Sequence, residues 1–165
     1  MAKDSSFDVV STVDMQEVDN AFQQTARELT QRYDLKSSRA TIELSKGDGT
    51  ITVNAPADFV AKQVIDVLNG RLVKRKVDLK SVSWDAPQAA SGSSVRVVGH
   101  IVQGIDKECA KKISKDIRDL KLKVKASVDD DKLRVTSASK DALQQVISFL
   151  RDQDYGIPLQ FTNYR

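Results

Sequence analysis

The feature of this sequence that most restricts its fold is an order of strand and helix signals that occurs twice. In the first half, residues 7–11 and 79–84 predict strands, and alternating segments around the turn Lys46–Gly49 predict a hairpin. Apolar residues at three- and four-residue steps predict a helix of about 18 residues that starts after Asp14. The same spacing predicts a second helix after Pro56.

The second half repeats this order of elements. Residues 94–102 predict a strand, and residues 106–119 and 139–150 predict helices with an apolar stripe. A second hairpin surrounds the acidic turn at residues 128–131, and residues 157–163 predict a closing strand. Each half therefore has the order βαββαβ, in which four antiparallel strands carry two helices on one face.

The two halves also match in residue type. A shift of 82 positions places Thr50–Leu68 over Lys132–Leu150, which supports a duplicated unit. Between them, residues 85–94 are small and polar and predict a linker or long surface loop. We therefore expect an α+β fold, a tandem of two ferredoxin-like or RNP-like βαββαβ domains.

Composition narrows the setting in which such a fold works. No apolar run approaches the roughly 18 residues of a membrane span, and the N-terminus lacks the layout of a signal peptide. With one cysteine there is no internal disulfide, so we expect a cytoplasmic protein with no membrane association. The net charge is −1 over residues 1–85 and +4 over residues 86–165, which permits an anionic partner.

The second predicted hairpin carries the basic residues. Residues 120–127, LKLKVKAS, alternate apolar residues with lysine, so as a strand they would place the two kinds on opposite faces. The face expected to be buried holds Leu122, Val124, Leu133, Val135, Leu159 and Phe161. The face expected to meet solvent holds Lys121, Lys123, Lys125, Lys132, Arg134, Gln160 and Thr162.

The segments SFDVVS (residues 6–11), LKLKVKAS with DDKLRVTSASKDALQQVI (residues 120–147) and PLQFTNYR (residues 158–165) resemble the bacterial YajQ family. The resemblance covers almost the whole chain. It implies two RNP-like domains that exchange their N-terminal strands. One domain would be residues 12–104, completed by strand 94–102. The other would be residues 1–11 with 105–165, completed by strand 6–11.

The resemblance also implies a small cytoplasmic nucleotide-binding protein, with cyclic di-GMP or RNA as ligand and a regulatory protein as a further partner. It supplies no catalytic motif and no cofactor. The residue pattern nominates no nucleophile with an adjacent base, so we expect a protein that is not an enzyme.

The candidate binding residues follow from the basic face. Lys121, Lys123, Lys125 and Arg134 would neutralise phosphate groups, and Arg96, Gln160 and Thr162 would donate or accept hydrogen bonds from neighbouring strands. The central strands lack the aromatic residues on which RNP-type proteins stack bases, which weakens sequence-specific RNA reading. A cleft between the two domains is an alternative place for the ligand. The alternative functions are RNA binding across the same basic sheet, and a protein-binding adaptor that uses the sheet of the first half while the lysines only keep an edge soluble.

Other charged or reactive residues have simpler expected roles. The basic side of the helix over residues 106–119 is typical of a solvated helix face, and Arg71–Lys76 follow a helix as basic residues commonly do. His100 and Cys109 are the only residues of their kinds, so we expect them to be structural and expect no metal site.

Overall fold

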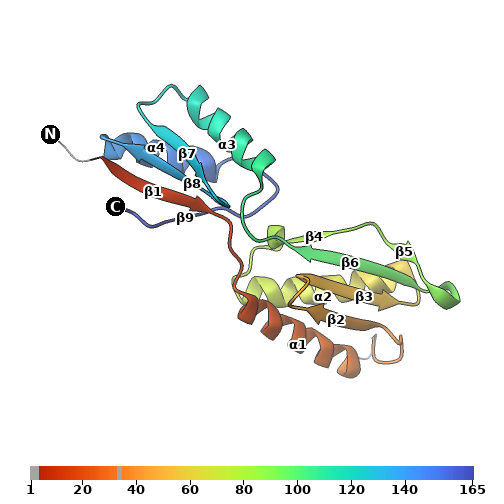
Figure 1. Cartoon of the computed structure of the whole chain (residues 1–165). Helices are drawn as coiled ribbons and strands as arrows, with labels where there is room; N and C mark the ends of the chain where they lie inside the picture. The colour runs from red at the N-terminus through yellow and green to blue at the C-terminus, as the bar shows by residue number, and fades with distance from the viewer. Residues whose placement is uncertain (1–3, 33–34) are drawn as a thin grey trace. The chain divides into compact units, whose positions relative to one another are not determined.

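A computed structural model describes residues 4–32 and 35–165. Within them lie four α-helices: α1 (Met15–Gln31), α2 (Asp58–Lys74), α3 (Lys107–Asp119) and α4 (Lys140–Arg151). The strands are β1 (Ser5–Val10), β2 (Thr41–Ser45), β3 (Thr50–Ala55), β4 (Val82–Trp84), β5 (Gln88–Ala89), β6 (Val95–Ile101), β7 (Lys125–Asp129), β8 (Lys132–Ser137) and β9 (Gln160–Thr162). They form two antiparallel sheets, so the protein is α+β (Figure 1).

The chain divides into two compact units. One contains Gln103–Arg165 together with the described residues up to Thr12, and the other is Val13–Val102. The first unit has a four-stranded sheet in the order β7-β8-β1-β9. Its central strand β1 comes from the start of the sequence and pairs with β8 on one side and β9 on the other.

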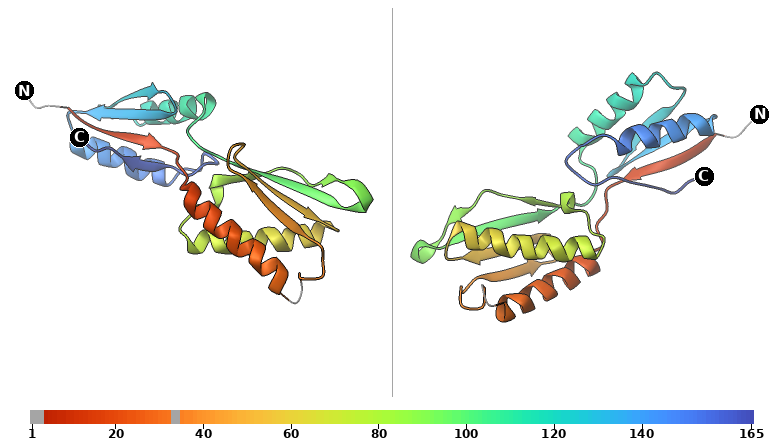
Figure 2. Two further views of the ribbon diagram at one scale, coloured as in Figure 1. Left: turned by 60° about the horizontal axis from the view of Figure 1, so that its bottom comes forward. Right: turned by 180° about the vertical axis from the view of Figure 1, so that it is seen from behind.

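The β7-β8-β1-β9 sheet is covered on one face by α3 and α4 (Figure 2). The register sets Phe7 beside Val135 and Val9 beside Leu133, and all four side chains are fully buried. Apolar residues of the two helices fill the core against them, among them Ile113, Ile117, Val146, Ile147 and Leu150. Burial of these faces from water is the main force that holds the unit together.

The second unit has the strand order β2-β3-β6-β4, and the short strand β5 also pairs with β6. Its sheet therefore has one strand more than the four that the sequence predicts. Helices α1 and α2 pack on one face, and their apolar stripes meet Ile51, Val53 and Val97 in a separate core. Strand β6, from the second half of the sequence, is central here and pairs with β3 and β4.

Three helices begin at a polar side chain that satisfies free backbone N–H groups of the first turn. The Asp14 carboxylate accepts from Gln16 N and Glu17 N, Asp106 accepts from Cys109 N, and the Ser139 hydroxyl accepts from Ala142 N. The predicted helix starts near Asp14, Asp106 and Ser139 are therefore confirmed.

Residues 85–94 connect β4 to β6 within one sheet and contribute β5 to it, which fits the predicted long surface loop and not a linker between the two units. Residues 120–124 are not a strand, because α3 ends at Asp119, Lys121 has a left-handed φ of 56° and β7 starts only at Lys125.

Candidate functional site

The face of the β7-β8-β1-β9 sheet opposite its helices is polar, and we call it the open face. Its side chains are set by the pairing, which places Ser127 beside Arg134, Arg134 beside Asp8 and Asp8 beside Thr162. The alternation of side chains along each strand then defines the whole surface. It consists of Ser6, Asp8, Val10, Lys125, Ser127, Asp129, Lys132, Arg134, Thr136, Gln160 and Thr162.

A buried carboxylate lies at the centre of the open face. Asp8 is only 2% exposed, and its Oδ1 accepts a hydrogen bond of 3.0 Å from Arg134 Nε. Its Oδ2 accepts a 2.9 Å bond from Asn163 Nδ2 and lies 3.9 Å from Lys132 Nζ. Asp8 therefore fixes Arg134 and Lys132 at the middle of the sheet, where the guanidinium remains partly exposed.

The electrostatics of this pair follow from its surroundings. Burial by itself raises the pKa of Asp8, but the hydrogen bonds from Arg134 and Asn163 and the charges of Arg134 and Lys132 lower that pKa overall. The hydrogen bond to Asp8 and its negative charge also raise the pKa of Arg134. Both groups are therefore charged at neutral pH, and the pair is a fixed part of the surface.

The three lysines of the LKLKVKAS stretch are exposed, but they do not lie in one strand. Lys121 lies in the turn after α3, Lys123 lies in a bend, and Lys125 is the first residue of β7. Leu122 and Val124 are partly buried against the core, as expected of that side. The prediction of a strand with three adjacent lysines is wrong, and Lys125 alone of the three belongs to the open face.

The two predicted residues of β9 have different surroundings. Gln160 accepts hydrogen bonds from Thr12 N at 2.8 Å and Thr12 Oγ1 at 3.2 Å, and its Nε2 donates to Thr12 O at 3.2 Å. Its amide therefore anchors the segment that leaves β1. Thr162 is exposed on the open face beside Asp8, where its hydroxyl can meet a ligand.

Arg96 does not share the open face with the other candidates. It lies on β6 of the other unit, opposite Asn54 of β3 and Gln88 of β5. On β2 and β3 the side of this sheet away from the core carries Thr41, Glu43, Thr50, Thr52 and Asn54, a polar set with a single charge. The expected grouping of Arg96 with Lys125 and Arg134 on one sheet is therefore wrong.

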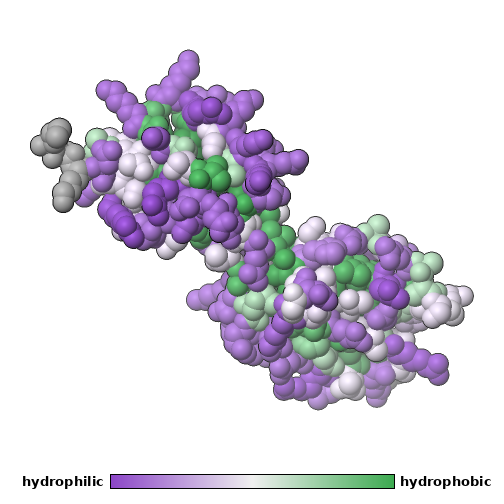
Figure 3. All heavy atoms as spheres, in the orientation of Figure 1, coloured by the Kyte–Doolittle hydropathy of each residue, from purple (hydrophilic) through white to green (hydrophobic). Residues whose placement is uncertain are grey.

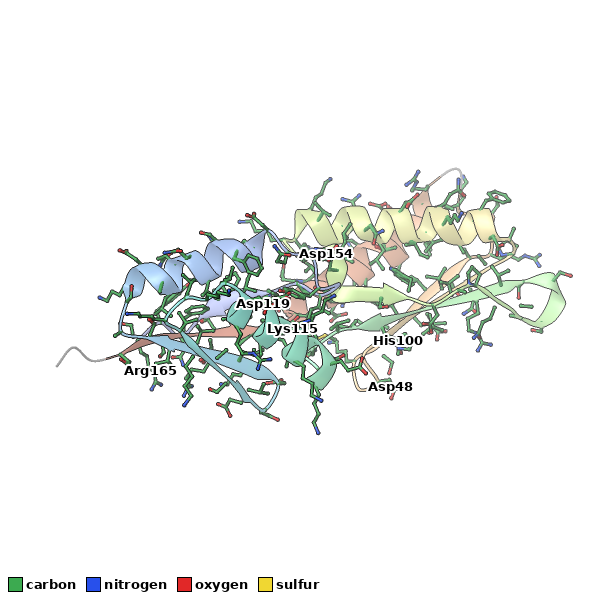
Figure 4. All side chains as sticks on the ribbon, turned by 90° about the horizontal axis from the view of Figure 1, so that it is seen from above. Asp48, His100, Lys115, Asp119, Asp154 and Arg165 are labelled. Atoms are coloured by element: carbon green, nitrogen blue, oxygen red, sulfur yellow. The ribbon has the colours of Figure 1, made fainter. Side chains whose placement is uncertain are left out.

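His100 also projects from this second sheet rather than into a core (Figure 4). Its Nε2 lies 2.7 Å from Asp85 Oδ2, and both side chains are about half exposed, 52% and 51%. The contact with Asp85 links β6 to the segment after β4, which agrees with the structural role expected for His100. Cys109 is partly buried against its unit's core, and burial raises the pKa of its thiol, as does nearby Asp106.

The other basic clusters divide into two kinds. Arg71 forms an ion pair with Glu28. Arg75 Nη1 lies 3.4 Å from Glu17 Oε2, and Arg75 Nε donates a 3.3 Å hydrogen bond to Gln24 Oε1. Both arginines therefore connect α2 to α1. By contrast, Lys111, Lys115 and Arg118 are exposed on α3 (Figure 4). The face of this unit that Figure 3 shows is largely hydrophilic.

In the part of the chain that the structure describes, no three His, Cys, Asp or Glu residues are grouped so that they could hold a metal ion. None of the described helices combines the length and the apolar character that a membrane crossing requires.

Asp8 and Asn163 are not among the site residues that the sequence predicts. An acidic residue between Phe7 and Val9 in an apolar strand was the available signal for Asp8. Its basic partners could not be named without the pairing of β1 with β8, which are more than 120 positions apart in the sequence. The side-chain bond from Asn163 depends on the path of the chain after β9.

Comparison with known proteins now gives the family. A family model described as "Nucleotide-binding protein YajQ-like" matches residues 5–165. A protein of Desulfitobacterium hafniense named nucleotide-binding protein is 49% identical over the full length of both chains. Proteins with the same name from Chloroherpeton thalassium and Alkaliphilus oremlandii are 46% and 44% identical, also over the full length of both chains. The chain therefore belongs to the YajQ-like family of nucleotide-binding proteins.

Proposed function

We propose that this protein binds the phosphate groups of a nucleotide on its open face, without catalysing a reaction. The observation that carries this proposal is the Asp8–Arg134–Lys132 cluster, with Lys125 on the same surface in β7, the strand next to β8. Its cations come from neighbouring strands of a rigid sheet. A flat array of this kind suits an anion with several oxygens.

Asp8 contributes by orienting Arg134. In the described contacts, Arg134 donates to the carboxylate through its Nε–H alone, so its terminal N–H groups can donate to a ligand. A guanidinium held in this way loses little side-chain entropy when a phosphate binds, and it can contact two phosphate oxygens at once. Lys132 and Lys125 add positive charge on either side, and the Thr162 hydroxyl adds a neutral hydrogen-bonding group.

The same surface disfavours base stacking. Its two central strands present Ser6, Asp8 and Val10 from β1 and Arg134 and Thr136 from β8, none of which is aromatic. Single-stranded RNA readers of RNP type depend on aromatic residues at such positions. A compact ligand recognised mainly through phosphate is therefore the better match, and a cyclic dinucleotide such as cyclic di-GMP is the specific candidate that we propose.

Calorimetric titration tests this proposal. Cyclic di-GMP, GTP and a short single-stranded RNA are titrated into the wild type and into a Lys125→Ala/Lys132→Ala double variant, each at two salt concentrations. We expect saturable binding of the dinucleotide that weakens by about tenfold or more in the double variant, because charge-assisted contacts are lost. Lys62→Ala is the matched control, because Lys62 is an exposed residue of α2 in the other unit. This variant should bind the dinucleotide as the wild type does.

Two results would contradict the proposal. Dinucleotide binding that is equal in the wild type and the double variant would move the site away from the open face. Binding of RNA alone, with a salt slope of about −0.7 per phosphate contacted, would favour an RNA-binding module. An Arg134→Lys variant adds a check on geometry, because it keeps the charge but cannot bind phosphate in the bidentate manner of arginine.

A further inference from the structure

Strand β7 ends its sheet, in the order β7-β8-β1-β9, and no other described strand pairs with its outer side (Figures 1 and 2). Edge strands of this kind present free backbone N–H and C=O groups to any second strand that matches them. Natural proteins often protect such an edge with a bulge, a proline or charged side chains. Lys125–Asp129 contains no bulge and no proline, and its two charged residues lie only at its ends and have opposite signs. This edge is therefore available for pairing.

The register determines which backbone groups point outward. A two-residue turn, Asp130–Asp131, joins Asp129 to Lys132, so these two paired residues close the hairpin. Pairs that exchange both backbone hydrogen bonds alternate along an antiparallel ladder with pairs that exchange none. Ser127 therefore directs its backbone groups toward Arg134, whereas Ala126 and Val128 direct theirs to the free edge.

The charges along β7 are complementary to those of a second copy of β7 placed antiparallel to it. Its sequence is KASVD, with Lys125 at one end, Asp129 at the other and Ser127 at the midpoint. We propose that two copies of this chain associate through β7, paired antiparallel about Ser127. Lys125 of each copy then lies opposite Asp129 of the other, which gives two ion pairs related by symmetry.

This register also satisfies the backbone. With Ser127 at the centre, Ala126 lies opposite Val128 of the second copy, and these are the residues whose N–H and C=O groups point outward. A shift of two residues in either direction still sets outward-pointing backbone groups opposite each other, but it leaves only three residues of β7 paired. It also places Lys125, or in the other direction Asp129, opposite Ser127, so no ion pair forms. A register shifted by one residue places Ala126, whose backbone groups point outward, opposite Ser127, whose groups point toward β8, so the hydrogen bonds cannot form.

An exposed apolar side chain supports the same arrangement. Val128 is 52% exposed although it lies on the helix-covered side of the sheet. Together with Ala126 it lines a groove of about 280 Å³ between β7 and α3, whose other lining residues are Lys111, Ser114 and Arg118. In the proposed register, Ala126 of the second copy covers Val128, which removes apolar surface from water.

The groove also limits the strength of the association. A second copy brings its own Lys111 and Arg118 to the same side of the joined sheet, and like charges there oppose pairing. The paired segment is short, so the interface is smaller than those of permanent dimers. We therefore expect a weak dimer in rapid exchange with the monomer rather than an obligate one.

Sedimentation velocity on the full chain, without nucleotide, tests the proposal over a concentration series that reaches about 1 mM. The wild type should show a sedimentation coefficient that rises with concentration. Lys125→Asp or Asp129→Lys alone places like charges opposite each other twice in each dimer, so each should weaken association by about fivefold or more. The Lys125→Asp/Asp129→Lys double variant restores both ion pairs with reversed sign and should associate within about twofold of the wild type.

Controls separate this result from a general effect of charge. Lys62→Asp makes the same charge change on α2 of the other unit and should leave the association unchanged. Amide hydrogen exchange gives a second readout that does not depend on substitution. Protection of the Ala126 and Val128 amides should increase with protein concentration, whereas that of Ser127 should not.

Three outcomes would overturn the proposal. A wild type that stays monomeric at the highest concentration would show that the edge does not pair with itself. Association that neither single variant weakens would place the interface elsewhere. If the double variant stays as weak as the single variants, pairing does not follow this register, and an acidic extended peptide that uses Lys111 and Arg118 becomes the better occupant of the edge.

Discussion

Asp8 carries a negative charge at the centre of the open face on a side chain that is almost fully buried. An Asp8→Ala substitution removes the acceptor for Arg134 and Asn163, and we expect it to lower the free energy of unfolding by about 1–3 kcal/mol. Urea denaturation monitored by circular dichroism measures the change. Asp129→Ala, an exposed carboxylate on the same face, should change stability by about 0.5 kcal/mol or less. Equal losses in the two variants would mean that the buried pair adds no stability.

The same residue predicts a dependence on pH. The pKa of Asp8 in the folded protein lies below its ordinary value of 3.8, so the folded state binds the proton less readily than the unfolded chain does. The stability that Asp8 contributes is therefore fully present above that ordinary value and is lost as the pH falls through the folded pKa. We expect the stability difference between the wild type and Asp8→Asn to be constant from pH 7 to about pH 5 and to shrink below about pH 4. A difference that widens in acid would contradict this assignment.

At the scale of single elements, Gly99 controls the contact between β6 and β4. A methyl group added there would lie 2.8 Å from Trp84 Cε3 and 2.8 Å from Val82 Cγ1, and both of those residues belong to the paired strand. We expect Gly99→Ala to destabilise the protein by about 1–3 kcal/mol through overpacking. Gly70→Ala is the matched control, because α2 has open space around Gly70 and alanine favours a helix. Thermal unfolding should shift in opposite directions for the two variants, and a shift in the same direction would refute the steric argument.

The elements show why the sequence predicted some features and not others. Capping residues such as Asp14 and alternating strands such as β3 are local patterns, so their positions could be read directly. The alternation in LKLKVKAS looked like one strand because Leu120 and Leu122 do pack against the core, although they do so from the end of α3 and from the irregular segment before β7. Periodicity reports which side chains are buried, and here it did not report the backbone conformation that buries them.

The candidate site residues also divide into those that the pattern of their own strand could place and those whose position depends on strand pairing. Arg134 and Thr162 could be placed on a solvent-facing side from their own strands alone, and the structure has them there. Asp8 and Arg96 could not be placed, because their neighbours depend on which sheet β1 and β6 join. Phe7 and Val9 indicate that β1 has a buried face, but they carry no information on its partner strands. The resemblance to a known family supplied that partner, and the residue pattern did not.

For the whole molecule, the exchange of strands predicts which fragments fold. We infer that the two units are domains, and residues 13–102 contain every strand of the β2-β3-β6-β4 sheet together with its core. Expressed alone, this fragment should give a dispersed NMR spectrum and cooperative unfolding. Residues 103–165 lack β1, whose Phe7 and Val9 are fully buried between β8 and β9, so this fragment should remain unfolded.

A synthetic peptide of residues 4–12 restores the missing central strand, and we expect it to fold the 103–165 fragment when the two are mixed. A division after residue 85, which the two sequence repeats suggest, removes β6 from the β2-β3-β6-β4 sheet and β1 from the other sheet, so it should leave neither half folded. The fragments of residues 13–102 and 1–85 differ mainly in whether they include β6, so a difference in their folding can be assigned to that strand. If residues 103–165 fold without the peptide, or residues 1–85 fold alone, β1 and β6 are dispensable and the two units are not the folding domains of this chain.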